Sequence, residues 1–381
     1  MKISRFFMPL MAGLLLASCG SKTEYTLNVN LNDELVGSTV YLTDYITGQV
    51  LDSAKAETTS VVFKGEAPET RIATVKTDRY YGICFLEPGS IYLDPITDSL
   101  SGTPLNEAFF KAAFSPELKK ANADCNAAYE KYQQAAQAGD AEALIKQLDP
   151  VLDSLIDRYE NMRSNSLKEL YEGNKDNLLG AFVLSDLAQD FQSSTELEKA
   201  LEGASDVVRN FPPIQKIAEM LIGIDRTSPG RPFIDLKGIN FATGQEETLS
   251  NMIQGKLALV DFWASWCGPC KAEIKENLVR LYKEYSKKGL VIVGVDVWER
   301  EEGAHAKAVE TLGIEYPQLI DSKNEAGNLY GFNAIPQIIL ISPEGTILAR
   351  DLRGDEIEKA IVENLVPVAT RHIEYYDNDK E

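Results

Sequence analysis

The ten residues from Asp261 to Cys270 read Asp-Phe-Trp-Ala-Ser-Trp-Cys-Gly-Pro-Cys, and they decide the fold of the C-terminal part of the chain. They place a Cys-x-x-Cys pair between an apolar segment, Leu257–Trp263, and a helical segment that runs to about Ser286. This spacing at a helix start lets both sulfur atoms meet on one turn, where the positive end of the helix stabilises a thiolate. The stretch therefore predicts a redox-active dithiol with Cys267 as the outer nucleophile and Cys270 as the more buried resolving thiol.

Two other uses of such a pair are a structural disulfide and one half of a Cys₄ zinc site. A bridge across so short a loop stabilises little, and the chain has no second Cys-x-x-Cys for zinc. The only histidines, His305 and His372, lie far apart in the sequence, which excludes a multi-histidine metal centre. No metal site and no cofactor is predicted. Cys84 and Cys125 carry no motif and are expected to be buried thiols, with a mutual or redox disulfide as the alternative.

Strand-like and helical segments alternate over residues 228–367. This alternation predicts an α/β sheet with helices on both faces. After the first strand and helix, the expected elements are a strand at Leu290–Val297, a helix near Gly303–Leu312, a hairpin of Gln337–Ile341 and Thr346–Arg350, and a closing helix at Asp355–Leu365.

This part of the chain resembles the thioredoxin superfamily, in which Cys-Gly-Pro-Cys is the thioredoxin form of the motif. Glu273, three residues beyond the pair, is similar to the active-site glutamate of the TlpA/ResA branch of extracytoplasmic thiol–disulfide oxidoreductases. The resemblance implies that Asp261 is buried and moves protons for Cys270. It also implies that Pro336 follows a cis peptide bond, faces the disulfide and lies beside backbone that receives the substrate as an added strand. Trp266 is expected at the rim of the active site.

The two carboxylates near the pair differ in their expected environment. Asp261 lies inside an otherwise apolar strand, where an unpaired carboxylate costs on the order of several kcal/mol. Burial should raise the pKa of Asp261, whereas the helix start should lower that of Glu273. We therefore expect Asp261, before Glu273, to be the base that deprotonates Cys270. The alternatives are a solvent-facing or edge position for Asp261 and a solvated first-turn position for Glu273.

The N-terminus has the features of an export signal. Lys2 and Arg5 precede an uncharged run, Phe6–Ala17, that is too short to span a membrane and ends in Leu-Ala-Ser-Cys at residues 16–19. The ending resembles a bacterial lipobox, which implies a signal peptide at 1–18, lipidation of Cys19 and a tether at 19–24. An ordinary signal peptide with an incidental cysteine is the alternative. Gly20, in place of the aspartate that signals inner-membrane retention, favours the outer membrane.

Three further segments complete the predicted organisation of the 381 residues. Residues 25–104 alternate in the manner of short strands and predict an all-β, sandwich-like domain. Leu51–Ala54 and Leu86–Gly89 resemble a β-rich domain of unknown function that precedes thioredoxin domains in bacterial lipoproteins. Residues 105–227 have helical periodicity, with breaks or starts expected at Asp149-Pro150 and Phe211–Pro213, and we interpret this segment as a spacer rather than a substrate-facing clamp. Residues 368–381 form an acidic tail.

Composition narrows the function further. The 38 basic and 58 acidic residues give a net charge of −20, which argues against nucleic acid as a partner.

The predicted function is a lipid-anchored, periplasm-facing thiol–disulfide oxidoreductase of a Gram-negative bacterium that reduces the disulfides of client proteins. An electron donor of the DsbD/CcdA membrane type is implied. One alternative is a thiol peroxidase of the AhpC/TSA-like group, although Ala264 stands where those enzymes carry threonine. Another is a binding lipoprotein whose redox domain is secondary.

Overall fold

The structure is a computed structural model that describes residues 23–94, 96–97, 99–137, 141–321 and 323–365. The predicted signal peptide, Cys19 and the acidic tail lie outside these residues, as does most of the tether. No helix within the described ranges is long and apolar enough to cross a membrane. The chain divides into two compact units, one of residues 1–174 with 178–180 and one of residues 175–177 with 181–381. This division falls inside the segment predicted as one helical stretch at 105–227.

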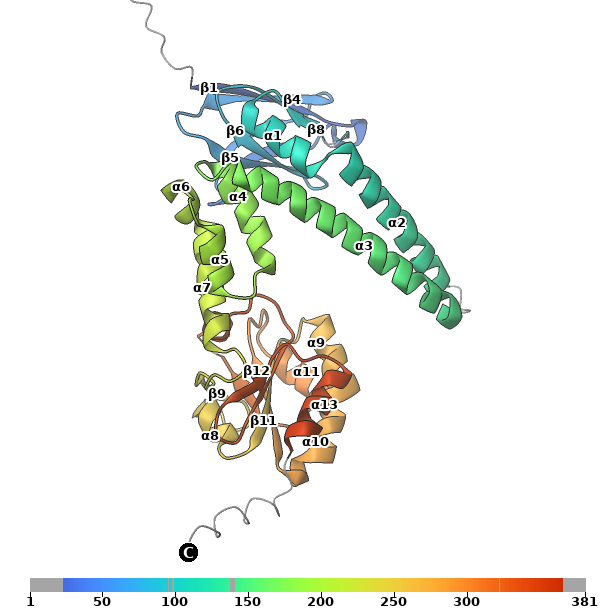
Figure 1. Cartoon of the computed structure of the whole chain (residues 1–381), viewed down its shortest axis with the longest axis vertical. Coiled ribbons are helices and arrows are strands. Elements are labelled where there is room, and N and C mark those ends of the chain that lie inside the picture. The colour runs from blue at the N-terminus through green and yellow to red at the C-terminus, as the bar shows by residue number, and fades with distance from the viewer. Residues whose placement is uncertain (1–22, 95, 98, 138–140, 322, 366–381) are drawn as a thin grey trace, which may run out of the picture. The chain divides into compact units, whose positions relative to one another are not determined.

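The first unit begins with a β-sandwich, as the sequence predicts (Figure 1). One sheet has the strand order β4-β1-β7-β8 and the other β3-β2-β5-β6. Alternate residues of β1, among them Leu27 and Val29, are buried, and apolar side chains from both sheets form one core. The strands are β1 (Glu24–Asn30), β2 (Thr39–Asp44), β3 (Val50–Lys55), β4 (Ser60–Glu66), β5 (Arg71–Lys76), β6 (Tyr81–Leu86), β7 (Gly89–Asp94) and β8 (Ser99–Ser101).

Helices α1 (Pro104–Ala113), α2 (Pro116–Gln137) and α3 (Ala141–Glu172) follow the sandwich. Helices α2 and α3 pack along each other as a hairpin (Figure 1). The prediction of a helix break or start at Asp149-Pro150 is wrong, because α3 continues through Pro150. Pro150 is exposed, and the packing of α3 against α2 stabilises the helix despite the backbone hydrogen bond that proline removes.

The second unit contains the rest of the helical stretch and the C-terminal α/β domain. The helical elements are α4 (Leu178–Leu187), whose first three residues belong to the first unit, the 3₁₀ turn η2 (Ala188–Asp190), α5 (Ser194–Ala200), α6 (Asp206–Arg209) and α7 (Pro212–Arg226). Helix α7 packs against α12 (Ala326–Tyr330) of the α/β domain. Gly223 of α7 and Gly331 after α12 touch backbone to backbone, and a Cβ at either position would lie under 3 Å from the other segment. This part of the helical stretch is therefore not a spacer.

The α/β domain is built on a seven-stranded sheet in the described residues, with the order β10-β9-β13-β12-β11-β14-β15. The central strands β11 and β12 are parallel, β14 is antiparallel to β11, and every residue of β11, β12 and β14 is buried. The strands are β9 (Lys237–Asn240), β10 (Glu246–Thr248), β11 (Leu257–Trp263), β12 (Leu290–Asp296), β13 (Gln318–Ile320), β14 (Gln337–Ile341) and β15 (Ile347–Ala349).

Helices cover both faces of this sheet, which confirms the predicted fold class. One face carries a continuous helix of α9 (Gly268–Glu273), a π-helical turn (Ile274–Leu278) and α10 (Val279–Tyr285), together with α11 (Ala304–Leu312) and α13 (Asp355–Asn364). The other face packs against α8 (Leu249–Ile253) and α12. The motif of residues 261–270 thus runs from the centre of the sheet into the start of a long helix.

Candidate active site

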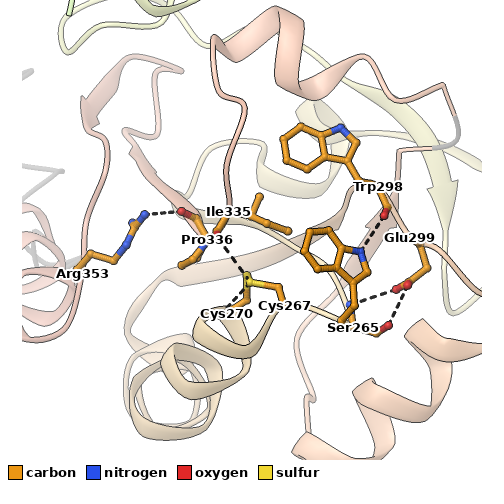
Figure 2. Close-up of a disulfide and its surroundings, with 9 residues drawn as sticks. Ser265, Cys267, Cys270, Trp298, Glu299, Ile335, Pro336 and Arg353 are labelled. Carbon is orange, nitrogen blue, oxygen red and sulfur yellow. Dashed lines mark hydrogen bonds between the residues drawn. A yellow bond between two sulfur atoms is a disulfide. The ribbon is translucent and has the colours of Figure 1, made fainter. Parts of the chain in front are cut away.

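The two cysteines of the motif form a disulfide at the start of α9 (Figure 2). Their Cα atoms are 5.3 Å apart. Cys267 is the N-cap residue, and its Sγ accepts a hydrogen bond of 3.1 Å from the backbone N–H of Cys270. Cys267 keeps 3% of its surface exposed and Cys270 none. A client sulfur can therefore reach the pair only at Cys267.

The loop before β14 faces this disulfide. The Ile335–Pro336 peptide bond is cis, as the resemblance implied. The Sγ atom of Cys267 lies 3.6 Å from the carbonyl oxygen of Ile335, and the carbonyl oxygen of Pro336 accepts a hydrogen bond from the guanidinium group of Arg353 (Figure 2). Backbone polar groups thus lie directly beside the sulfur atoms.

Trp266 forms an exposed rim on the opposite side of the disulfide, with 38% of its surface accessible. Its Nε1–H donates a hydrogen bond of 2.9 Å to the carbonyl oxygen of Trp298, and the guanidinium group of Arg300 lies 3.8 Å from its ring centroid. The Glu299 carboxylate accepts hydrogen bonds from the backbone N–H and hydroxyl of Ser265, at 3.1 and 2.9 Å (Figure 2). The loop after β12 therefore fixes the two residues that precede Cys267.

Sequence analysis did not identify Trp298, Glu299 or Arg300 as part of this site. The one available signal was their place just after the predicted strand Leu290–Val297. The pKa of Glu299 is lowered overall: burial raises it, but hydrogen bonds from the N–H of Arg300 and from Ser265, with the charge of His305, outweigh burial.

Asp261 lies on the central strand β11, between β12 and β14, and is 1% exposed. This placement rules out the edge or solvent-facing alternative. Its Oδ2 atom has no hydrogen-bond partner among the residues that the structure describes. Burial, reinforced by the charge of Glu273 and opposed by Arg353, raises the pKa of Asp261 to about 8. The nearby hydroxyl group of Tyr316 is also buried, and burial and the charge of Asp261 raise its pKa well above 10.

Glu273 is half-buried in the first turns of the helix, and its interactions are specific. Its carboxylate accepts hydrogen bonds from the Asn277 side-chain amide at 2.6 Å and from the backbone N–H of Gly354 at 3.2 Å. It is therefore not the solvated first-turn glutamate of the alternative. The structure places the two predicted carboxylates close enough that the charge of Glu273 raises the pKa of Asp261.

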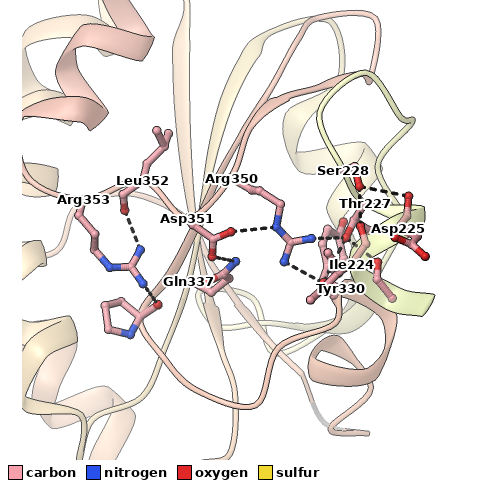
Figure 3. Close-up of polar contacts among 12 residues, drawn as sticks. Ile224, Asp225, Thr227, Ser228, Tyr330, Gln337, Arg350, Asp351, Leu352 and Arg353 are labelled. Carbon is pink, nitrogen blue, oxygen red and sulfur yellow. Dashed lines mark hydrogen bonds and ion pairs between the residues drawn. The ribbon is translucent and has the colours of Figure 1, made fainter. Parts of the chain in front are cut away.

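An open groove of about 530 Å³ runs beside Pro336 within the second unit. Its lining includes Phe191 and Gln192 after η2, Met220 of α7 and Arg353. Figure 3 shows how α7 is joined to this region: the guanidinium group of Arg350 donates to the hydroxyl of Thr227 at 2.7 Å and to the carbonyl oxygen of Tyr330 at 3.0 Å. The helical stretch therefore forms one wall of a groove next to the disulfide.

The remaining described cysteines, Cys84 and Cys125, are buried, free and in the first unit. Burial raises the pKa of Cys84 to about 12, and burial with the charges of Asp124 and Glu160 raises that of Cys125. The prediction of buried thiols is confirmed for both residues.

The buried carboxyl group of Asp261 predicts that stability depends on pH. Between its ordinary pKa of 3.8 and its folded value of about 8, the folded chain holds a proton that the unfolded chain has released. Below about pH 4 the carboxyl group is protonated in both states and does not lower the free energy of unfolding. As the pH rises toward 8 the free energy of unfolding falls, by on the order of 4 kcal/mol at pH 7. Asp261→Asn should remove this loss and make the oxidised chain more stable than wild type at pH 7.

Urea unfolding followed by tryptophan fluorescence measures this effect, because all three tryptophans, Trp263, Trp266 and Trp298, lie in the second unit. The difference in the free energy of unfolding between Asp261→Asn and wild type should grow from pH 5 to pH 7.5. A difference that stays constant over this range would show that Asp261 titrates normally.

Comparisons with known proteins find relatives of the C-terminal part of the chain. A model of the AhpC/TSA family matches residues 229–350. The chain is 32% identical over 124 residues to the thiol-disulfide oxidoreductase ResA of Oceanobacillus iheyensis, a match that covers 32% of this chain and 64% of that protein. The chain thus spans less than two thirds of that relative.

A second relative, the ResA protein of Geobacillus kaustophilus, is 30% identical over 141 residues, which cover 36% of this chain and 76% of that protein. Among solved structures, the thioredoxin domain of a thiol-disulfide oxidoreductase from Bacteroides vulgatus is 30% identical, with a TM-score of 0.34, and the match covers 36% of this chain and 99% of that one. Through its C-terminal thioredoxin-like domain, the chain belongs to the ResA-type thiol-disulfide oxidoreductases.

Proposed function

We propose that this chain reduces disulfide bonds of client proteins through the Cys267–Cys270 dithiol. The observation that carries the proposal is the disulfide itself: it lies at a helix start, opens to solvent only at Cys267, and faces the backbone beside Pro336. The Gly-Pro pair between the cysteines is that of thioredoxin, a reductant with a potential of about −270 mV. The direction of transfer is therefore from this chain to the client.

The first chemical step uses Cys267. In the reduced chain the Cys267 thiolate, stabilised at the helix N-terminus, attacks one sulfur of the client disulfide. A mixed disulfide forms, and the other client sulfur leaves as a thiolate that takes a proton from solvent. The hydrogen bond from the N–H of Cys270 to the Cys267 sulfur favours the thiolate before attack.

The second step uses Cys270 and a base. Cys270 is fully buried, so its thiolate forms only if a nearby group accepts the proton. Asp261 suits this role because its raised pKa of about 8 lies close to that of a thiol. The Cys270 thiolate then attacks the Cys267 sulfur and releases the second client sulfur as a thiol. Two electrons have passed from this chain to the client, so the client is reduced and Cys267 and Cys270 form a disulfide.

The groove beside Pro336 suits an extended client segment. Backbone carbonyl groups of Ile335 and Pro336 border it, and added-strand pairing uses groups of this kind. Since Phe191 and Met220 line the same groove, the helices before the α/β domain take part in client binding.

Peroxide reduction is the second candidate, favoured by the match to the AhpC/TSA family over residues 229–350. Position 264, where such peroxidases carry a threonine hydroxyl, holds a buried alanine. We therefore expect the chain to reduce insulin, with dithiothreitol as donor, faster than it consumes hydrogen peroxide. Parallel assays at equal enzyme concentration measure both rates, and faster peroxide turnover would favour the peroxidase.

The cellular setting is also proposed. The chain is exported, carries a lipid on Cys19 and works on the periplasmic side of a Gram-negative membrane, more specifically the outer membrane. A donor of the DsbD/CcdA type regenerates the dithiol, since an oxidising compartment supplies no thiol pool of its own. The lipobox-like residues 16–19 and the short apolar run before them support this proposal.

Lipidation predicts a simple result. The Cys19→Ser variant should lose lipid labelling and move from the membrane fraction to the soluble fraction, because a lipid on Cys19 is the proposed anchor. Fractionation and labelling with a fatty-acid analogue measure this change, and Cys125→Ser is the matched control. A Cys19→Ser protein that stays labelled in the membrane pellet would contradict the proposed anchor.

A further inference from the structure

Three metal-ligating side chains meet beside the α/β sheet, apart from the dithiol. Asp296 ends strand β12, Glu299 lies in the loop that follows, and His305 is in the first turn of α11. One ligand atom from each, an imidazole nitrogen or a carboxylate oxygen, lies within 4.8 Å of the other two. The proposed thiol chemistry uses neither Asp296 nor His305.

Two of these side chains are buried and have polar atoms without hydrogen-bond partners among the described residues. His305 is 6% exposed and Asp296 is 4% exposed. Both ring nitrogens of His305 and the Oδ1 atom of Asp296 have no hydrogen-bond partner in the described part of the chain. Buried polar groups without partners cost free energy. A cation that accepts the lone pair of one imidazole nitrogen and one from Asp296 would remove part of that cost, while the other ring nitrogen of a neutral imidazole keeps its proton.

The spacing of the atoms suits an ion. The Nδ1 atom of His305 lies 3.3 Å from the Oδ2 atom of Asp296 without hydrogen-bond alignment. Tetrahedral ligands at about 2.0–2.2 Å from a zinc ion are roughly 3.4 Å from one another. Glu299 accepts two hydrogen bonds from Ser265 and one from the backbone N–H of Arg300, and a carboxylate offers about four lone-pair sites, so it retains capacity for an ion.

The surroundings hold the imidazole and admit a cation. The His305 ring packs 5.0 Å from the rings of both Trp263 and Phe241, which fixes its plane but provides no partner for its nitrogens. An open pocket of about 390 Å³ joins the three ligands to solvent, and Glu301 and Glu302 also line it. Arg300 lines the pocket as well, and the two carboxylates outweigh its charge together with the half positive charge of the α11 N-terminus.

We propose that Asp296, Glu299 and His305 bind one divalent first-row transition-metal ion, with water completing its coordination. One imidazole and two carboxylates suit Zn²⁺ and its neighbours, whereas Ca²⁺ and Mg²⁺ prefer oxygen ligands throughout. The three ligands do not include the cysteines, although Glu299 also accepts hydrogen bonds from Ser265, two residues before Cys267.

The test is titration of the full chain with Zn²⁺ in a calorimeter, with the Cys267–Cys270 disulfide formed so that thiolates do not compete. Wild type should bind one equivalent. His305→Phe keeps the aromatic packing but removes a ligand, and it should weaken binding by at least about 100-fold, since loss of even an outer-shell partner costs 10–100-fold. Glu299→Gln, at a half-buried position, should also weaken binding. Glu301→Gln loses the same charge from the same pocket and should change the affinity little.

Co²⁺ gives a second readout. Bound at this site, it should show visible d–d bands without sulfur-to-cobalt charge transfer, and circular dichroism should show that each variant is folded. Three results would overturn the proposal: no stoichiometric binding by the oxidised chain, equal affinity of the folded ligand variants and wild type, or sulfur charge-transfer bands that place the ion on Cys84 or Cys125.

Discussion

Cys267→Ser should leave no measurable disulfide reductase activity, because the only sulfur of the pair that a client can reach is removed. The expected loss is on the order of 10⁶-fold, the scale seen when a protease loses its nucleophile. Cys270→Ser should behave differently: the first attack still occurs, but the mixed disulfide persists because no thiol resolves it. Insulin reduction measures the first effect, and non-reducing gel electrophoresis of trapped complexes measures the second.

Cys125→Ser is the matched control for both variants, because Cys125 lies in the other unit and outside the described active site. Its activity should equal that of wild type. Mass spectrometry of the proteins trapped on Cys270→Ser would identify the clients. Trapping on Cys267→Ser instead would show that the roles of the two cysteines are reversed.

Asp261→Asn should slow the resolution of a preformed Cys267 mixed disulfide by about 10²-fold or more at neutral pH, the usual scale for a positioned general base. The amide keeps the shape of the carboxyl group but cannot take the Cys270 proton. The wild-type rate should rise between about pH 6 and pH 8 as Asp261, with its pKa of about 8, becomes the carboxylate. Stopped-flow release of a fluorescent thiol from the mixed disulfide measures this rate.

Glu273→Gln is the matched change at the second carboxylate. Glu273 accepts hydrogen bonds from Asn277 and Gly354 and raises the pKa of Asp261, so its removal should shift the pH profile toward lower pH. The maximum rate should fall much less than in Asp261→Asn. If Glu273→Gln alone slows resolution, Glu273 is the base and the order that we propose for the two carboxylates is wrong.

The sequence by itself determined the two central strands beside the site, the cysteine pair and the buried aspartate. The mostly apolar run Leu257–Trp263 predicted the position and length of β11, and the run Gln337–Ile341 did the same for β14. The Cys-x-x-Cys pair at the strand-to-helix junction and an aspartate inside the buried strand are local features, so residue order alone was sufficient to identify them. Short strands such as β9, β10 and β13, of three or four residues, were missed because too few residues are present to show a period.

Only the tertiary structure decided which distant residues complete the site. Strands β11 and β12 are parallel and in register, with Trp263 opposite Asp296, so the segments that follow both strands emerge at one edge of the sheet. This brings Glu299 to Ser265 across 34 positions, and a longer connection brings the N–H of Gly354 to Glu273 across 81. Local sequence patterns report backbone periodicity and burial, whereas such contacts depend on strand order and helix crossovers, which no single stretch of the chain encodes.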